Sequence, residues 1–460
     1  MIRKFAPGVL LVLLFCDLAA VGQAATKPQF ISFEAAQPVL TGMAESLPAE
    51  LQHANLDAKK WDAWVQSKDR ETRARLDRGE EDTLTNLLRF GVTFTKEFRI
   101  DDQYLVRYGE STLVNSFAEK RANDLIRALA APNAGAGLQE MRAFLEKKGF
   151  SLKSPQGREK ARKYLLDNLA RMRDEFIKYH NTPKDEARFQ LFKDRGISLD
   201  TNLWPDYQLE QSFRELLQKG LLQRGSVHRI AIVGPGLDFV NKEAGNDFYP
   251  PQTIQPFAVM DSLIRLGLAD ANTLEVHTLD ISSQVNLHVA RARKNAAAGR
   301  PYTVQLPWNT TRPMSPEFRA SFVDYWRKLG GAIGETIPAI PVPSAAEGTE
   351  TRAVRIRPDV VKKLTPVDMN IVFQRLERSP QGAFDLVIGT SIFIYYDAFE
   401  QSLARANVAA MLKPGGYLLS NDKLPETVSS GLDKALETKI EMSHDPQIVD
   451  YIFCYKRGDR

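Results

Sequence analysis

The sequence predicts an α/β fold, a doubly wound and mostly parallel sheet in the C-terminal half, preceded by an all-helical N-terminal domain. From residue 229 onward, short apolar runs alternate with helical stretches, which is typical of a parallel sheet covered by helices on both faces. Before that point, apolar residues recur at three- and four-residue spacings without apolar strand runs. A glycine turn directly follows the first apolar run, as in sheets that bind nucleotide-like ligands.

Length and composition are those of a globular protein. The 460 residues are 43% hydrophobic and 26% charged, enough for two or three domains with sizeable cores. The net charge is only +4, and the basic residues form no stripe interleaved with aromatic ones. We therefore expect no nucleic-acid partner.

The N-terminus has the pattern of an export signal. Arg3 and Lys4 precede an apolar run at residues 9–15, and small residues at 22–24 suit cleavage before Ala25. This predicts a signal peptide at residues 1–24 and an exported protein, either periplasmic or secreted. The alternative is an uncleaved segment that anchors the chain to the inner membrane. We expect no other membrane span.

The region after the signal is predicted to be helical. Helix-forming residues dominate 47–78, 103–131, 138–148 and 155–179, and Pro183 ends the pattern. We place an all-helical domain at residues 25–205 and the α/β domain at 206–460.

The second half predicts alternating strands and helices. The expected strands are 229–233, 274–279, 384–388 and 417–420, with helices at 254–268, 284–298 and 398–412. Two further β-rich runs, 438–442 and 448–455, suggest an antiparallel pair at the sheet edge. The Pro-rich stretch 337–350 is expected to be a surface loop.

Gly234 and Gly236 form the first candidate site. They follow the strand 229–233, where a glycine backbone lets a ligand approach closely. A Gly-Pro-Gly sequence can equally be only a turn. The stretch 241–253 is expected to overhang a ligand bound there.

Asp280 is the second candidate. It ends the strand 274–279, where a carboxylate can accept hydrogen bonds from ribose hydroxyls. The alternative is that Asp280 caps the following helix, although Ser282 or Ser283 could cap it equally well.

A third pattern lies near the C-terminus. Phe-Asp-Leu-Val-Ile at 384–388 is followed by a helix and then by Leu-Lys-Pro-Gly-Gly-Tyr-Leu at 412–418. This resembles the fourth and fifth strands of class I S-adenosylmethionine-dependent methyltransferases. Residues 353–422 further resemble the chemotaxis-receptor glutamate methyltransferases, and 228–280 do so loosely. The resemblance implies a Rossmann-like methyltransferase sheet, S-adenosylmethionine as cofactor and an unidentified methyl acceptor.

The resemblance also implies roles for single residues. Gly234 and Gly236 would face the methionine part of the cofactor, and Asp280 would hold the ribose. Asn370 and Ile371 match a pair that contacts the adenine. Asp238 stands where the family has a third glycine and is included among the candidate cofactor-binding residues, while Ile232 replaces the usual acidic residue. Thr390-Ser391 replaces an Arg-Asn pair, which argues against a receptor-glutamate substrate.

Methyl transfer requires mainly alignment of the nucleophile, the methyl group and the sulfur. The candidate catalytic residues are Tyr395, which matches an aromatic near the transferred methyl, and Thr390 and Ser391, which could orient a substrate. Asp397 could act as a base or could cap the helix that starts at Ala398.

Other chemistries have less support. The histidines lack metal-ligand spacing, so no metal site is expected. His277 is expected to be a core or edge residue of a strand rather than a ligand, and Cys454 a core residue of a strand. Two other functions stay open: an exported, non-catalytic binding or structural protein on a degenerate methyltransferase scaffold, and a dinucleotide-dependent oxidoreductase. The latter does not explain the Leu-Lys-Pro-Gly-Gly pattern.

Overall fold

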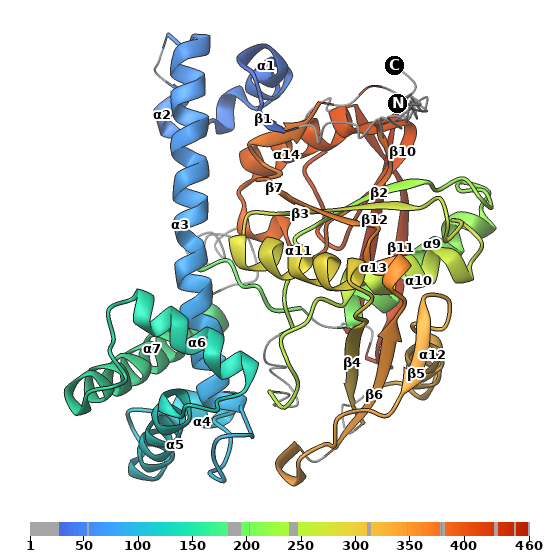
Figure 1. Cartoon of the computed structure of the whole chain (residues 1–460). Helices are drawn as coiled ribbons and strands as arrows, with labels where there is room; N and C mark the ends of the chain where they lie inside the picture. Colours follow the sequence, from blue (N-terminus) through green and yellow to red (C-terminus); the bar gives the residue numbers. More distant parts are fainter. Residues whose placement is uncertain are drawn as a thin grey trace, which may run out of the picture.

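The computed structural model of the chain (Figure 1) describes residues 27–460 apart from short gaps. The gaps are residues 53–54, 183–194, 202, 239–246, 311–313, 347, 378, 380–381, 427–430, 446–447 and 459–460. The expected signal peptide at 1–24 lies outside the described residues. No helix within the described part is long and apolar enough to cross a membrane.

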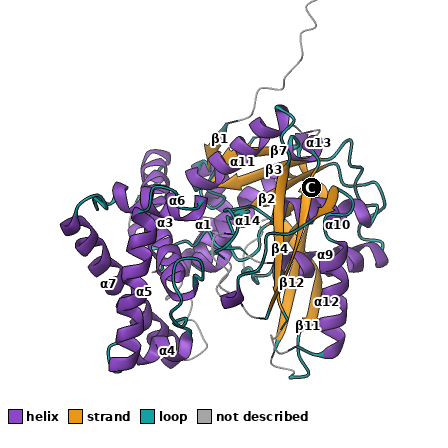
Figure 2. Cartoon of the chain, turned by 60° about the horizontal axis from the view of Figure 1, so that its bottom comes forward, coloured by secondary structure: helices purple, strands orange, loops and turns teal. Residues whose placement is uncertain are grey.

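A helical region is built around one long helix, α3 (Ala58–Phe90). Figure 1 shows α3 running beside the sheet domain, with a bundle of shorter helices around its lower part. These are α4 (Asp102–Arg107), α5 (Thr112–Ala130), α6 (Ala136–Lys147) and α7 (Pro155–Asn181). Their apolar faces share a core with the C-terminal part of α3 that is separate from the sheet cores. The predicted helical domain is confirmed here, and Figure 2 shows the bundle to one side of the strands.

The first residues of this region belong instead to the α/β domain, which corrects the all-helical prediction. The short strand β1 (Pro28–Phe30) pairs antiparallel with β8 (Gln374–Leu376). The helix α1 (Phe33–Gly42) and Trp61 of α3 pack into the core beneath the main sheet. The Trp61 indole donates a hydrogen bond to the Ile31 carbonyl at 2.8 Å. A three-residue strand carries too little alternation to be seen in the sequence.

The main sheet confirms the predicted doubly wound fold. Its strand order is β11-β12-β10-β9-β2-β3-β7. The strands are β2 (Arg229–Val233), β3 (Glu275–Asp280), β7 (Leu364–Asp368), β9 (Phe384–Ile388), β10 (Leu412–Ser420), β11 (Leu432–Glu441) and β12 (Val449–Arg457). The pairs β10-β9, β9-β2, β2-β3 and β3-β7 are parallel, whereas β12 is antiparallel to both of its neighbours, β10 and β11. The strand order therefore reverses between β2 and β9, the place where such sheets bind ligands.

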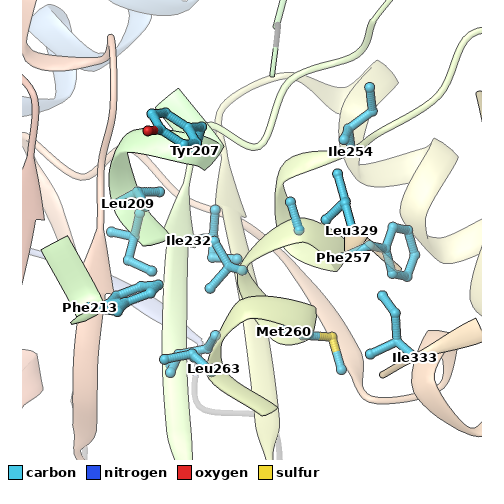
Figure 3. Close-up of a cluster of buried hydrophobic side chains, with 14 of the residues drawn as sticks. Tyr207, Leu209, Phe213, Ile232, Ile254, Phe257, Met260, Leu263, Leu329 and Ile333 are labelled. Atoms are coloured by element: carbon cyan, nitrogen blue, oxygen red, sulfur yellow. The ribbon is translucent and has the colours of Figure 1, made fainter. Parts of the chain in front are cut away.

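Helices cover both faces of the sheet. Along β2, Ile230 and Ile232 point to one face and Ala231 and Val233 to the other, as the two-residue period of a strand requires. Figure 3 shows Ile232 among side chains of α9 (Trp204–Gln218) and α10 (Gln255–Arg265). The helix α14 (Ala398–Met411) covers the opposite face. Near the edge at β7, α11 (Ser283–Ala297) packs on β7 and on the short helix α13 (Pro358–Val361).

A second, smaller sheet was missed in the sequence. It has the antiparallel order β4-β6-β5, with β4 (Tyr302–Asn309), β5 (Gly334–Ile337), β6 (Thr349–Ile356) and a covering helix α12 (Pro316–Lys328). Polar residues and Pro307 interrupt the apolar pattern of β4, and for this reason the sequence does not predict a strand there. The Pro-rich loop is confirmed at 338–343, between β5 and β6.

Candidate functional site

A cavity of about 320 Å³ lies at the carboxyl ends of β2, β3 and β9, and we call it the central cavity. Its walls come from the glycine turn after β2, the residues after β3 and β9, and Met369 and Ile371 after β7. The opposite wall comes from described residues of the segment 197–205, namely 197–201, 204 and 205, and from Leu76 of α3. Its volume falls in the range of small-molecule sites, and its position is the strand-order reversal of the sheet.

Gly234 and Gly236 line the central cavity, and both the backbone conformation and the neighbouring protein atoms require glycine at these two positions. Their φ angles are 61° and 67°, in the left-handed region that disfavours side chains. A Cβ on Gly236 would lie 2.6 Å from the Leu199 carbonyl oxygen. A Cβ on Gly234 would collide with the Ile392 side chain. The turn is therefore a cavity wall that is in close contact with Leu199 and Ile392, which line the same cavity.

Asp280 ends β3 and lines the central cavity with only 6% of its surface exposed. Its Oδ1 accepts a hydrogen bond from the Ser282 backbone N–H at 2.7 Å, and the Gly236 backbone also bonds to the carboxylate. Burial raises the pKa of Asp280 to about 7. The N-cap of α11 is Ser282, whose hydroxyl accepts from Val285 N. The reading of Asp280 as the helix cap is therefore wrong.

Asn370 and Ile371, the two residues expected to contact the adenine, differ in their position relative to the central cavity. Ile371 lines the central cavity, whereas Asn370 is fully buried outside its lining. The Asn370 amide donates to Asp69 of α3 at 2.9 Å and accepts from the Val372 N–H at 3.1 Å. The Asn370 side chain thus joins α3 to the sheet.

Asp238 is also placed away from the cavity. Its carboxylate accepts hydrogen bonds from the Tyr249 hydroxyl at 2.8 Å and from the Gln252 amide at 3.0 Å. Burial raises the pKa of Asp238 to about 7. Both partners belong to the connection that leads to α10, so Asp238 stabilises that connection.

The three candidate catalytic residues, Thr390, Ser391 and Tyr395, all line the central cavity. The Thr390 hydroxyl accepts a hydrogen bond from the Gln255 amide at 2.9 Å, which leaves its own proton available to a ligand. Ser391 has a φ of 58°, the only positive value among the described non-glycine residues. The Arg75 guanidinium of α3 donates to the Tyr395 carbonyl at 3.0 Å and fixes this turn.

Asp397, His277 and Cys454 have structural roles. Asp397 is the N-cap of α14 and forms a reciprocal capping box with Glu400, so the capping alternative is confirmed. His277 lies in β3 with its ring 5.3 Å from the ring of Phe384. Cys454 is fully buried in β12, and burial raises the pKa of its thiol to about 12. Across the described ranges, no group of three or more His, Cys, Asp or Glu side chains could hold a metal ion.

The segment 197–205 was missed in the sequence. It has no apolar periodicity, so nothing in its residues indicates that it faces the glycine turn. Residues 241–246 of the connection expected to overhang the ligand lie outside the described residues. Beyond them, Asp247 accepts hydrogen bonds from the Val92 N–H and the Thr93 hydroxyl, toward the helical bundle.

Comparisons with known proteins give only structural similarities. No protein-family profile and no curated protein matches this sequence. Solved structures of similar fold include N-methyltransferase NodS from Bradyrhizobium japonicum WM9 in complex with S-adenosyl-L-homocysteine, at 10% identity and a TM-score of 0.27 over 62% of this chain and 98% of that one. Magnesium protoporphyrin IX methyltransferase from Synechocystis PCC 6803 with bound S-adenosylmethionine has 12% identity and a TM-score of 0.26 over 62% and 90% of the two chains. The fold assignment rests on the strand order of this chain.

Proposed function

We propose that this protein transfers a methyl group from S-adenosylmethionine to an acceptor bound in the central cavity. The observation that carries the proposal is the cavity at the ends of β2, β3 and β9, with a glycine turn at one strand end and a buried carboxylate, Asp280, at the next. This is the arrangement that the loose resemblance of residues 228–280 to methyltransferases leads one to expect.

The residues of the central cavity fit such a cofactor. A carboxylate has about four lone-pair positions, and two backbone N–H groups use part of that capacity at Asp280, so ribose hydroxyls can donate to the rest. Ile281, Met369 and Ile371 provide an apolar wall suited to a flat adenine ring. We assign Asp280 and Ile371, with the backbone of Gly234 and Gly236, to cofactor binding.

When bound, the cofactor supplies an activated methyl group on a positively charged sulfur. The task of the protein is then to align the acceptor and exclude water. Thr390, held by Gln255, can donate a hydrogen bond to the acceptor, and Tyr395 can pack against it. Ser391 holds the turn between them through its N–H, which donates to Asn421 at 2.6 Å.

A second candidate is a binding protein that keeps the sheet without the reaction. The contacts of Ile392 with Gly234 and of Leu199 with Gly236 favour it, because both glycines have protein atoms packed against them. Export would favour it too, since S-adenosylmethionine is made in the cytoplasm. We propose cleavage near Ala25, with membrane anchoring as the alternative, and N-terminal sequencing of protein from the cell envelope distinguishes the two.

Calorimetry of the purified mature chain with S-adenosylmethionine, S-adenosylhomocysteine and NAD in parallel separates the functions. The methyltransferase predicts binding of the first two ligands and none of NAD. Binding of NAD alone would support the oxidoreductase. Binding of none of the three would favour the scaffold.

A further inference from the structure

The lining of the central cavity contains a second carboxylate besides Asp280, and an aromatic ring. Asp200 and Trp204 line it, together with Thr390 of the opposite wall. Trp204 begins α9, and its ring is stacked on Phe322 with centroids 4.3 Å apart and planes at 21°. The indole is thus held in one orientation by the core.

Asp200 is held by its local hydrogen bonds. Its backbone N–H donates to the Ser198 hydroxyl at 3.2 Å, and its Oδ1 accepts from the Thr83 hydroxyl at 3.5 Å. Ser198 lines the cavity as well. A carboxylate fixed at a cavity wall attracts a cation and repels an anion, and an aromatic face favours the same sign of charge.

The charged residues near the cavity agree with this preference. Of the described residues that line it, the ones that carry charge are Asp200 and Asp280. The nearby Arg75 guanidinium is engaged by two backbone carbonyls, those of Arg195 and Tyr395, and is not part of the lining. A carboxylate acceptor such as a glutamate side chain would therefore meet the carboxylate of Asp200 and, where Asp280 is ionised, a second negative charge.

We infer that the methyl acceptor is an amine, bound as its ammonium form between Asp200 and Trp204. This inference rests on the proposed function and specifies its substrate class. In the transfer the ammonium loses one proton to Asp200, the nitrogen lone pair forms the bond to the methyl carbon, and the carbon–sulfur bond breaks with its electrons on sulfur. The products are a methylated ammonium and a neutral thioether, with one proton released.

Three probes that share a phenyl ring and differ in their head group test the inference: phenethylamine, 2-phenylethanol and 3-phenylpropionate. Calorimetry on the full chain saturated with S-adenosylhomocysteine should show the amine binding at least tenfold more tightly than the other two. Asp200→Asn should reduce amine affinity to that of the alcohol. Asp174→Asn, in α7, should leave all three affinities unchanged, since its side chain is 72% exposed and does not line the cavity.

The inference is overturned if the carboxylate probe binds as tightly as the amine, if Asp200→Asn leaves the preference intact, or if no probe binds. Failure of S-adenosylhomocysteine itself to bind would instead contradict the proposed function. In that case the amine preference is measured on the protein alone, so the two failures remain distinguishable.

Discussion

Leu199 lies directly against Gly236, although 36 positions separate them in the sequence. The Leu237 N–H donates to the Leu199 carbonyl at 2.8 Å, and a Cβ on Gly236 would lie 2.6 Å from that carbonyl oxygen. The segment 197–205 is thereby joined to the glycine turn, and the two form facing walls of one cavity. The sheet domain alone would lack one wall of its site.

Gly236→Ala should destabilise the protein more than the same change at Gly220. Both glycines have a positive φ, 67° and 69°, so both substitutions carry a backbone cost of about 1–2 kcal/mol. A Cβ on Gly220 meets nothing within 4 Å, whereas on Gly236 it collides with Leu199. We expect Gly236→Ala to cost at least about 1 kcal/mol more in the free energy of unfolding, measured by urea denaturation. Equal costs would show that the Leu199 contact is not present in solution.

Binding of S-adenosylhomocysteine should strengthen as the pH rises from 6 to 8. The pKa of Asp280 is about 7, and only its ionised form accepts hydrogen bonds at both oxygens. At pH 6 most molecules must lose a proton before they bind, so we expect affinity roughly tenfold weaker than at pH 8. Asp280→Asn should remove the dependence.

Asp238→Asn is the matched control for that experiment, because its pKa is also raised to about 7 while its side chain lies outside the cavity lining. The wild-type pH dependence should persist in this variant. If it disappears there and persists in Asp280→Asn, the titrating group has been assigned to the wrong carboxylate. In the absence of ligand, the raised pKa of Asp280 makes its contribution to folding stability fall as the pH rises from about 4 to 7.

Asn370→Ala should weaken the fold and leave ligand affinity nearly unchanged. It removes the donor to Asp69 and the acceptor for the Val372 N–H, both buried, at a cost of about 1–3 kcal/mol. A direct contact with adenine would predict a tenfold loss of S-adenosylhomocysteine affinity with little effect on stability. Thermal melts and calorimetry of the one variant decide between the two roles.

Arg121→Met should destabilise the helical bundle strongly. The Arg121 guanidinium is buried and donates to the backbone carbonyls of Leu88 and Gly91 at 2.6 Å and of Glu97 at 2.9 Å. Losing these donors leaves buried carbonyls unsatisfied, at a cost of about 1–3 kcal/mol for each group left without water. Arg127→Met is the control, because the Arg127 side chain is 79% exposed. Similar melting temperatures for the two variants would contradict the role given to Arg121.

The sequence predicts the central strands of the main sheet, because they are buried on both faces and are therefore continuously apolar, but it does not predict the edge strand β7. The expected strand 384–388 coincides with β9, and the expected helix 398–412 matches α14 to within one residue. The edge and insertion strands β1 and β4 are short or interrupted by polar residues, so periodicity does not reveal them.

The candidate site was predictable only where residues follow those central strands. Gly234, Asp280 and Thr390 line the cavity because parallel strands end at the same edge of the sheet. Asp200 and Trp204 lie in the connection between the helical region and the α/β domain. The local sequence pattern does not predict how this connection is folded, so it does not predict that these two residues line the cavity. Asn370 shows that a position after a strand does not by itself place a side chain in the cavity. Its neighbour Ile371 lines the cavity, whereas the Asn370 side chain donates a hydrogen bond to Asp69 of α3, 301 positions earlier in the sequence.

The central claim is tested most directly by thermal melts of the wild type and of Asp280→Ala, each with and without millimolar S-adenosylhomocysteine. A charged acceptor bonded to a hydroxyl contributes about 1.5–3 kcal/mol. We therefore predict that the ligand raises the melting temperature of the wild type and that this stabilisation is largely lost in Asp280→Ala. No stabilisation of the wild type, or an equal stabilisation of both proteins, would contradict the assignment of the central cavity to S-adenosylmethionine.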